Sequence, residues 1–309
     1  MLSHCTNTPA AVFQNQSFLL FRKLSLNDTA VLRPYLDKKT GKACNFTIGQ
    51  LLMWRDFLDT RIAEKNGQLF IHAISEGFPT LVIPDMELDD SYFDAADAWF
   101  AQNKQVPAYF CYDEANYEKL LKRYPNMQIK EEDYAFDYIY DYAQFMDYPG
   151  KLMSKQRNHI HKFDRLYPNA KMHWITESNV SEVQQFFLQH NQATDLTDPM
   201  AKEEADKCTE VLSHMKEYGM LGMYMESDGR ILAFSIGEVI HDVLYVQIEK
   251  ADYTADGAYQ KMACEFAKAM HTDKTKWINR EEDVGDEGIR RSKQSYHPSL
   301  MLKKYSLRP

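Results

Sequence analysis

Residues 221–279 constrain the fold more than any other part of the chain. Short runs of β-branched, aromatic and other apolar residues alternate here with turn residues such as Asp228 and Gly229, which predicts consecutive antiparallel strands. Apolar residues then recur with a period near 3.6, which predicts an amphipathic helix followed by a short strand. We expect strands at residues 221–226, 231–238, 243–249 and 277–279, and the helix at residues 258–271.

Helix and strand patterns also alternate through the rest of the chain. In the first half, Asn66 and Gly67 predict a two-residue hairpin turn between apolar flanks. In the second half, a helix, a strand and two further helices are expected before residue 221. The fold class is therefore α/β (α+β). The sequence Asp-Tyr-Pro-Gly at residues 147–150 is the clearest break, so we place a domain boundary between residues 1–150 and 151–309. Further elements are expected at residues 18–24, 78–83, 91–103, 108–112, 115–124, 171–175, 180–190 and 202–218.

Charge and composition exclude several classes of protein. The chain of 309 residues has a net charge of −9 and lacks the broad basic footprint expected of a nucleic-acid-binding protein, so DNA is not an expected partner, whereas a local basic patch for tRNA stays open. Its 5 cysteines are far apart and predict neither a disulfide framework nor a zinc site, so no metal is expected. We find no apolar run long enough for a membrane span and no signal-peptide pattern at residues 1–16, which predicts a cytoplasmic location.

Residues 277–305 carry an unusual density of charges of both signs. Asp286 is a candidate N-cap for a helix over residues 287–295. With a period of 3.6, Lys293 lies on the same face as Ile289 and Tyr296, so its ammonium group points inward and requires an anionic partner. Two interpretations remain open: an internal salt-bridge network that includes residues 281–283, or a binding site.

Two other segments are candidate anion sites. A helical pattern over residues 152–169 has a basic face formed by Lys155, Asn158, Lys162 and Arg165. Lys155 and Arg157 of this helix are candidate phosphate ligands. A charged outer face is also what most surface helices show. The second segment is a strand followed by a glycine-containing loop and a helix start, where free backbone N–H groups bind anions. Gly257 and Ala258 occupy that place.

This order of elements resembles the GNAT acyltransferase fold, in which the loop after the fourth strand holds the pyrophosphate of an acyl coenzyme A. Gly257 matches the central glycine of the usual loop pattern, whereas Thr254 and Tyr259 stand at its first and last positions. Three segments resemble, more specifically, a family of mostly uncharacterised bacterial proteins related to the C-terminal catalytic domain of phosphatidylglycerol lysyltransferase. They are KLMSKQRNHIHKF, QIEKADYTADGAYQ and NREEDVGDEGIRRSKQSYHP.

The resemblance implies two tandem GNAT-like domains, of which the first is degenerate, and acyl or aminoacyl transfer. The lysyltransferase relatives move an aminoacyl group from a charged tRNA to a lipid hydroxyl, and Fem-type relatives move one to a peptidoglycan amine. The expected donor is therefore an acyl-CoA or an aminoacyl-tRNA. The expected acceptor is a small molecule or a lipid headgroup, reached without an integral membrane segment.

Such a reaction needs a base, donors to the carbonyl oxygen and an anchor for the donor's phosphates. Glu249 is the first candidate base and Glu281 the second, although Glu249 is equally suited to pair with Lys250 or Arg280. Asn279 and Tyr296 are candidates for orienting the acceptor. The candidate anchors are Arg280, Arg290 and Lys293, assisted by Lys155 or Arg157.

Two alternatives use the same residues differently. The loop at Gly257 departs from the GNAT pattern, which favours a non-catalytic protein that holds an anionic small molecule or an RNA end between its domains. The charged stretch also suits a purely architectural role that stabilises a dimer.

Overall fold

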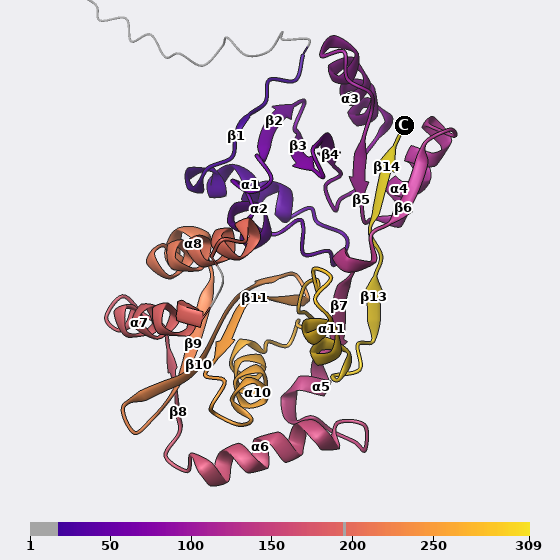
Figure 1. Cartoon of the computed structure of the whole chain (residues 1–309). Coiled ribbons are helices and arrows are strands. Elements are labelled where there is room, and N and C mark those ends of the chain that lie inside the picture. Colours follow the sequence, from indigo (N-terminus) through magenta and orange to yellow (C-terminus); the bar gives the residue numbers. More distant parts are fainter. Residues whose placement is uncertain (1–17, 194–195) are drawn as a thin grey trace, which may run out of the picture.

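The computed structural model describes residues 18–193 and 196–309, so Cys5 and the segment examined for a signal peptide lie outside the described residues. Two seven-stranded mixed sheets, each flanked by helices, make up the fold (Figure 1). This is the predicted α/β (α+β) class. Within the described ranges, none of the helices combines the length and the apolar character that crossing a bilayer requires.

The first sheet has the strand order β1-β2-β3-β4-β5-β14-β6. Helices α1 and α2 pack on it near the second sheet, and α3 and α4 lie farther away (Figure 1). Its strands are β1 (Arg22–Lys23), β2 (Arg61–Lys65), β3 (Gln68–Ser75), β4 (Phe78–Val82), β5 (Tyr109–Cys111), β6 (Gln128–Glu131) and β14 (Tyr305–Arg308). The helices are α1 (Thr29–Leu36), α2 (Ile48–Met53), α3 (Asp90–Gln102) and α4 (Glu114–Arg123).

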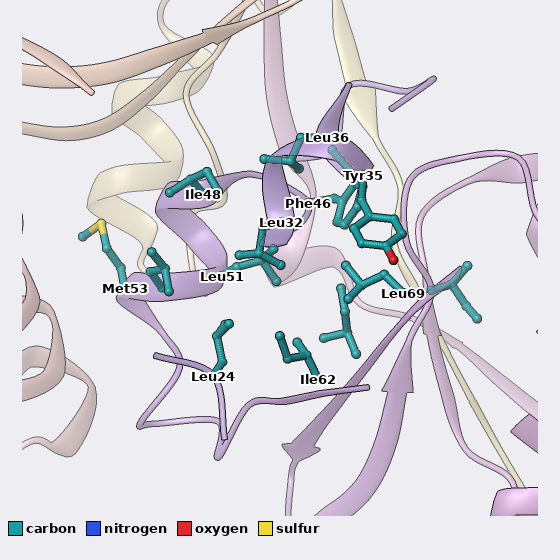
Figure 2. Close-up of a cluster of buried hydrophobic side chains, with 14 of the residues drawn as sticks. Leu24, Leu32, Tyr35, Leu36, Phe46, Ile48, Leu51, Met53, Ile62 and Leu69 are labelled. Carbon is teal, nitrogen blue, oxygen red and sulfur yellow. The ribbon is translucent and has the colours of Figure 1, made fainter. Parts of the chain in front are cut away.

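The core of this half lies between α1, α2 and the sheet, where apolar side chains from both layers meet (Figure 2). Leu32 from α1 and Leu69 from β3 are fully buried. Burying one such side chain contributes roughly 1.5–3 kcal/mol. Asn66 and Gly67 both have positive φ and form the turn between β2 and β3, which confirms the predicted hairpin.

The second sheet has the strand order β13-β7-β12-β11-β10-β9-β8. Helix α10 packs on it with Met262, Phe266 and Met270 buried, so these methionines fill the core. The strands are β7 (Asp137–Asp141), β8 (Lys171–Trp174), β9 (Leu221–Ser227), β10 (Arg230–Ile240), β11 (Val243–Ala251), β12 (Trp277–Asn279) and β13 (Leu300–Leu302). The helices are α5 (Tyr142–Asp147), α6 (Ser154–Leu166), α7 (Val180–His190), α8 (Pro199–Ser213), α9 (Met215–Tyr218), α10 (Ala258–Met270) and α11 (Glu287–Gln294).

Most of the elements predicted for the second half are confirmed, including the three-strand meander, the helix after it and the helix capped by Asp286. The helix predicted at residues 202–218 begins earlier, because Asp198 caps it, and is interrupted at His214. In the first half, the strand predicted at residues 18–24 is reduced to the two residues of β1. It pairs with β2 alone at the sheet edge.

The two sheets exchange strands. β7 precedes residue 150 but pairs with β12 and β13 in the second sheet, and the C-terminal β14 pairs with β5 and β6 in the first. The proposed division at residue 150 remains a prediction. What the sheets establish is that the chain crosses between them twice, before β7 and between β13 and β14.

A buried ion pair lies at the second of these crossings. Lys304 precedes β14, and its Nζ lies 2.6 Å from Asp137 Oδ1 at the start of β7. Both side chains have 0% exposure. Its neighbour Lys303 is exposed and pairs with Glu131 at 2.8 Å. Two adjacent lysines therefore form ion pairs in very different surroundings.

We expect Lys304→Met to lower the free energy of unfolding by about 3–5 kcal/mol, because the substitution leaves a buried carboxylate without its cation. The matched variant Lys303→Met removes an exposed pair and is expected to cost about 1 kcal/mol or less. Urea unfolding of both variants and the wild type measures the difference. Equal losses in the two variants would contradict a special role for the buried pair.

Candidate functional site

The candidate site lies where two neighbouring strands of the second sheet separate. β11 and β12 run parallel, but they pair only from Val243 opposite Trp277 to Tyr245 opposite Asn279. β11 then continues along β10 to Ala251, whereas the chain after Asn279 leaves the sheet. The charged residues that follow β12 therefore face the second half of β11 across a gap in the sheet.

A β-bulge at Gln247 marks the same region of β11. Gly237 on β10 permits it, because a Cβ at this position would lie 2.3 Å from the carbonyl oxygen of Tyr245. Bulges are frequent beside active sites, where they redirect side chains. Here Gln247 Nε2 donates a hydrogen bond of 3.2 Å to Glu238 Oε1, which also accepts one from the backbone N–H of Gly49. Burial raises the pKa of Glu238 to about 7.

Glu249 and Arg280 form an ion pair across the gap, with 2.6 Å between Glu249 Oε1 and Arg280 Nη2. Both side chains are largely buried. The guanidinium group of Arg280 also lies 4.7 Å from the ring centroid of Tyr296, which is itself buried. This is the ion pair that the sequence offered as the alternative role of Glu249. The Nη1 of Arg280 is buried and makes no hydrogen bond to any described residue.

Glu281 and Lys293 lie next to this ion pair and interact electrostatically with each other. Glu281 has a positive φ of 60°, and its Oε1 is buried without a partner among the described residues. Burial raises the pKa of Glu281 to about 8, although the neighbouring Lys293 opposes the shift. Burial also lowers the pKa of Lys293 to about 8. The Lys293 ammonium donates a hydrogen bond to the backbone carbonyl of Glu282.

Two groups whose pKa values meet near neutral pH exchange a proton with little free-energy change, which suits general acid–base catalysis. Strained backbone conformations also concentrate at functional sites, because the surrounding structure must hold them in place. Glu281 combines both properties, since its positive φ is costly for a residue other than glycine.

A largely buried cluster joins this region to the first sheet. Asp137 Oδ2 accepts hydrogen bonds from the backbone N–H of Cys44 at 2.7 Å and from Asn279 Nδ2 at 2.8 Å. Lys304 Nζ lies 2.6 Å from Asp137 and 2.5 Å from Glu282. Burial raises the pKa of the Cys44 thiol well above its ordinary value, so this cysteine is a hydrogen-bond donor and not a thiolate nucleophile.

The cluster also contains a set of atoms spaced like metal ligands. One atom each from Cys44, Asp137 and Glu282 lie within 4.8 Å of one another. The ammonium group of Lys304 lies among them, within 3.5 Å of all three residues. The lysine cation already neutralises these carboxylates. The three residues therefore do not fit a metal site.

The structure brings Glu249, Asn279, Arg280, Glu281, Lys293 and Tyr296 together around the gap between β11 and β12. Arg290 lies on the outer side of α11, where its Nε is 2.7 Å from Asp283. Asp283 also accepts a hydrogen bond of 2.6 Å from the hydroxyl of Tyr138. Arg290, Asp283 and Tyr138 thus form part of an internal network of charged and polar groups, like the one proposed from the sequence as one interpretation.

The remaining predicted residues lie on or under α6. Lys155 is exposed, and Arg157 donates to the backbone carbonyls of Tyr148 and Gly150. Gly257 has a φ of 83°, and a Cβ there would lie 2.3 Å from the carbonyl oxygen of His159. Ala258 is buried beside it. The backbone of α6 therefore lies against the start of α10, and Gly257 permits that close contact.

A match to a known protein family covers most of the chain. Residues 40–308 match the family described as "Phosphatidylglycerol lysyltransferase, C-terminal". The chain belongs to this family. The resemblance found in the sequence is thereby confirmed, and the chain is related to lysylphosphatidylglycerol synthetases.

Two solved structures share the fold over nearly the whole chain. A conserved protein of unknown function from Bacteroides thetaiotaomicron has 25% identity and a TM-score of 0.86, covering 94% of this chain and 99% of that one. L-PGS from Bacillus licheniformis has 14% identity and a TM-score of 0.60, covering 91% and 92%. An uncharacterised protein of Mycoplasmoides gallisepticum is 25% identical over 174 residues, which are 55% of this chain and 54% of that protein. The match thus spans about half the length of this curated relative.

The sequence analysis did not identify four residues that lie in or beside the candidate site: Cys44, Gln50, Asp137 and Lys304. Gln50 on α2 lies beside the carboxyl of Glu281, and Asp137 and Lys304 form the cluster between the sheets. One signal was present, because Asp137 opens a run of strand-forming residues and Lys304 lies just before another. Charged residues beside such runs must either point outward or have a buried partner.

The raised pKa of Glu281 predicts a pH-dependent stability. Between about pH 4.5 and 8 the folded carboxyl holds a proton that the unfolded one has lost, so raising the pH favours unfolding. We expect wild-type stability to fall relative to Glu281→Gln across this range, by at most ~1.4 kcal/mol per pH unit. Chemical denaturation at pH 5, 6, 7 and 8 measures this.

The exposed Glu287 provides the matched control, since Glu287→Gln on α11 is expected to leave the slope unchanged. If Glu281→Gln had the same slope as the wild type, Glu281 would have to be ionised throughout this range.

Proposed function

We propose that this protein transfers an aminoacyl group from a charged tRNA to an amine or hydroxyl acceptor. The observation that carries the proposal is that Glu281 and Lys293, which interact electrostatically in the gap between β11 and β12, both have pKa values near 8. Direct acyl transfer requires a group that accepts the acceptor's proton near neutral pH. The family description, which names a lysyltransferase, supports the same class of reaction.

The side chains around the gap supply distinct roles. Glu281, in its carboxylate form, accepts the proton as the acceptor's nitrogen or oxygen attacks the ester carbonyl, and the Arg280 Nη1 donates a hydrogen bond to the carbonyl oxygen as it becomes anionic. Glu249 acts as a positioning residue because its carboxylate holds the guanidinium group. The bond between the carbonyl carbon and the tRNA 3′ oxygen then breaks, and Glu281 returns the proton to that oxygen. Lys293 stabilises the carboxylate form of Glu281.

The start of α10 favours aminoacyl-tRNA over acyl-CoA as the donor. In the GNAT-like arrangement, the loop before this helix holds the pyrophosphate of coenzyme A. Here the carbonyl oxygen of His159 lies against Gly257, and Lys162 on α6 pairs with Asp256. A carbonyl oxygen and a carboxylate at this place disfavour a polyanion.

The exposed face of α6 suits an acceptor at an anionic lipid surface. Lys155 and Arg165 are exposed on this helix, and Lys151 is exposed just before it. Leu152 and Leu166 near the two ends are 73% and 54% exposed. Basic side chains beside exposed leucines are typical of helices that lie on anionic bilayers. Helix α6 also lies at the end of the molecule farthest from the first sheet, at the bottom of Figure 1.

Vesicle binding tests this surface. Each basic residue near an anionic bilayer contributes about 1 kcal/mol, so Lys155→Glu combined with Arg165→Glu is expected to weaken binding to phosphatidylglycerol vesicles at least tenfold. Lys122→Glu combined with Lys216→Glu, at exposed positions of α4 and α9, makes the same charge change elsewhere. Sedimentation with vesicles of phosphatidylglycerol and of phosphatidylcholine measures both. If both double variants lost the same amount of vesicle binding, the effect would come from net charge alone and would not support a membrane-binding face on α6.

Transfer itself is tested with labelled aminoacyl-tRNA and an excess of lipid or amine acceptor. Glu281→Gln and Lys293→Met are each expected to lower the transfer rate by roughly 10²–10⁴-fold without loss of the folded state, because each disables the proton acceptor. Lys303→Met makes the same substitution at an exposed lysine and should retain the wild-type rate. Wild-type rates in the Glu281 and Lys293 variants would exclude them from the chemistry.

A thermal-shift titration with acetyl coenzyme A, coenzyme A, charged tRNA and uncharged tRNA identifies the donor. A saturable rise in melting temperature with charged tRNA alone supports the proposal. A ligand present at ~100 times its Kd stabilises the folded protein by about 2.7 kcal/mol. A rise in melting temperature with coenzyme A or acetyl coenzyme A would identify an acyl-CoA as the donor instead. No change in melting temperature with any of the four ligands would favour the non-catalytic binding protein.

A further inference from the structure

A mostly apolar cavity of about 160 Å³ lies between α2 and one face of the first sheet. Leu51 and Trp54 line it from the side of α2, and Ile71 and Ala73 line it from β3. Ile71 and Ala73 are two positions apart on a strand, so they point to the same face of the sheet. The cavity is therefore framed by two rigid elements.

Three polar residues of the lining connect the cavity to the candidate site. Gln50 and Glu282 line the cavity, and Gln50 also lies beside the carboxyl of Glu281. Asn45, a third polar residue of the lining, donates a hydrogen bond of 3.1 Å to Glu282 Oε1. A group bound in the cavity thus has its polar end beside the proposed proton acceptor.

The size of the cavity limits what it holds. A protein cavity of about 150 Å³ lined by aliphatic and aromatic side chains accommodates one benzene molecule. This cavity therefore fits one side chain of the size of leucine, methionine or phenylalanine, and it is too small for a lipid acyl chain.

The charges on the lining limit its chemistry. Among the described residues that line the cavity, Glu282 is the sole acidic one. A lysine side chain extended along the wall formed by Leu51, Ile71 and Ala73 would place its ammonium group among apolar side chains, which costs free energy. An α-ammonium group beside Glu282, in contrast, has a carboxylate within reach, which it would share with Lys304.

We infer that this cavity receives the side chain of the transferred aminoacyl group, and that this side chain is apolar. The α-ammonium group faces Glu282, and the ester carbonyl lies toward Glu281. This inference rests on the proposed aminoacyl transfer and specifies its substrate class as an apolar amino acid, in place of the lysine that the family description names.

The experiment measures binding of one tRNA body charged in turn with leucine, phenylalanine, lysine or aspartate, so that the amino acid alone varies. The wild type is expected to bind the leucyl and phenylalanyl forms at least tenfold more tightly than the lysyl and aspartyl forms. One methylene in an apolar pocket already changes discrimination by 10–200-fold.

Two variants change the cavity in opposite directions. Ala73→Leu fills it and should weaken binding of the leucyl and phenylalanyl forms at least tenfold while leaving the lysyl form unchanged. Trp54→Leu enlarges it and should shift the preference toward a tryptophanyl-charged tRNA, so the inference is tested even if Ala73→Leu fails to fold. Ala101→Leu, on the exposed surface of α3, is the matched control and should change nothing.

The outcomes separate this inference from the proposed function. Preference for the lysyl form, or no preference among the four, would overturn the apolar side-chain pocket and leave aminoacyl transfer standing. Failure to bind any charged tRNA above the uncharged one would overturn both.

Discussion

The arrangement of the whole molecule depends on the buried cation Lys304. Its ammonium group contacts Asp137 at the start of β7 and Glu282 in the segment after β12, and the next residue begins β14 of the other sheet. A buried ion pair contributes little net stability compared with apolar packing, because desolvation of the ions offsets their attraction. Removing only one partner of such a pair is costly, however, because the other charge then stays buried without a counterion. We therefore interpret this cluster as fixing the relative position of the sheets where the chain crosses between them.

The same cluster positions the candidate site. Asp137 holds Asn279 at the end of β12, and the side chain of Asn279 accepts a hydrogen bond from the backbone N–H of Glu281. Glu282, the next residue, is held by Lys304. Glu281 is thus fixed on both sides in a conformation with positive φ, which a free segment would avoid. The contacts of Asp137 and Lys304, which lie where the chain crosses between the sheets, therefore also fix the position of the Glu281 carboxyl group.

The sequence predicted what local patterns determine. The meander, the helix after it and the cap at Asp286 follow from periodicity and turn residues, and the inward position of Lys293 follows from its place on the helix. The exchange of β7 and β14 was not predictable in this way, because which sheet a strand joins is decided by contacts far apart in the sequence. Asp137 and Lys304 are separated by 167 positions. The cavity beside α2 was missed for the same reason, since its walls come from separate segments.

The charges around the gap explain why Glu281 holds a proton near neutral pH. Four carboxyl groups, those of Asp137, Glu249, Glu281 and Glu282, lie near three cations, Arg280, Lys293 and Lys304. Arg280 is bound to Glu249, and Lys304 is shared by Asp137 and Glu282. Lys293 is left to Glu281, but burial disfavours the charged form of each. The pair therefore gains or loses one proton more readily than the other groups, and any substrate that brings a positive charge to Glu282 shifts that balance toward the ionised, proton-accepting carboxylate.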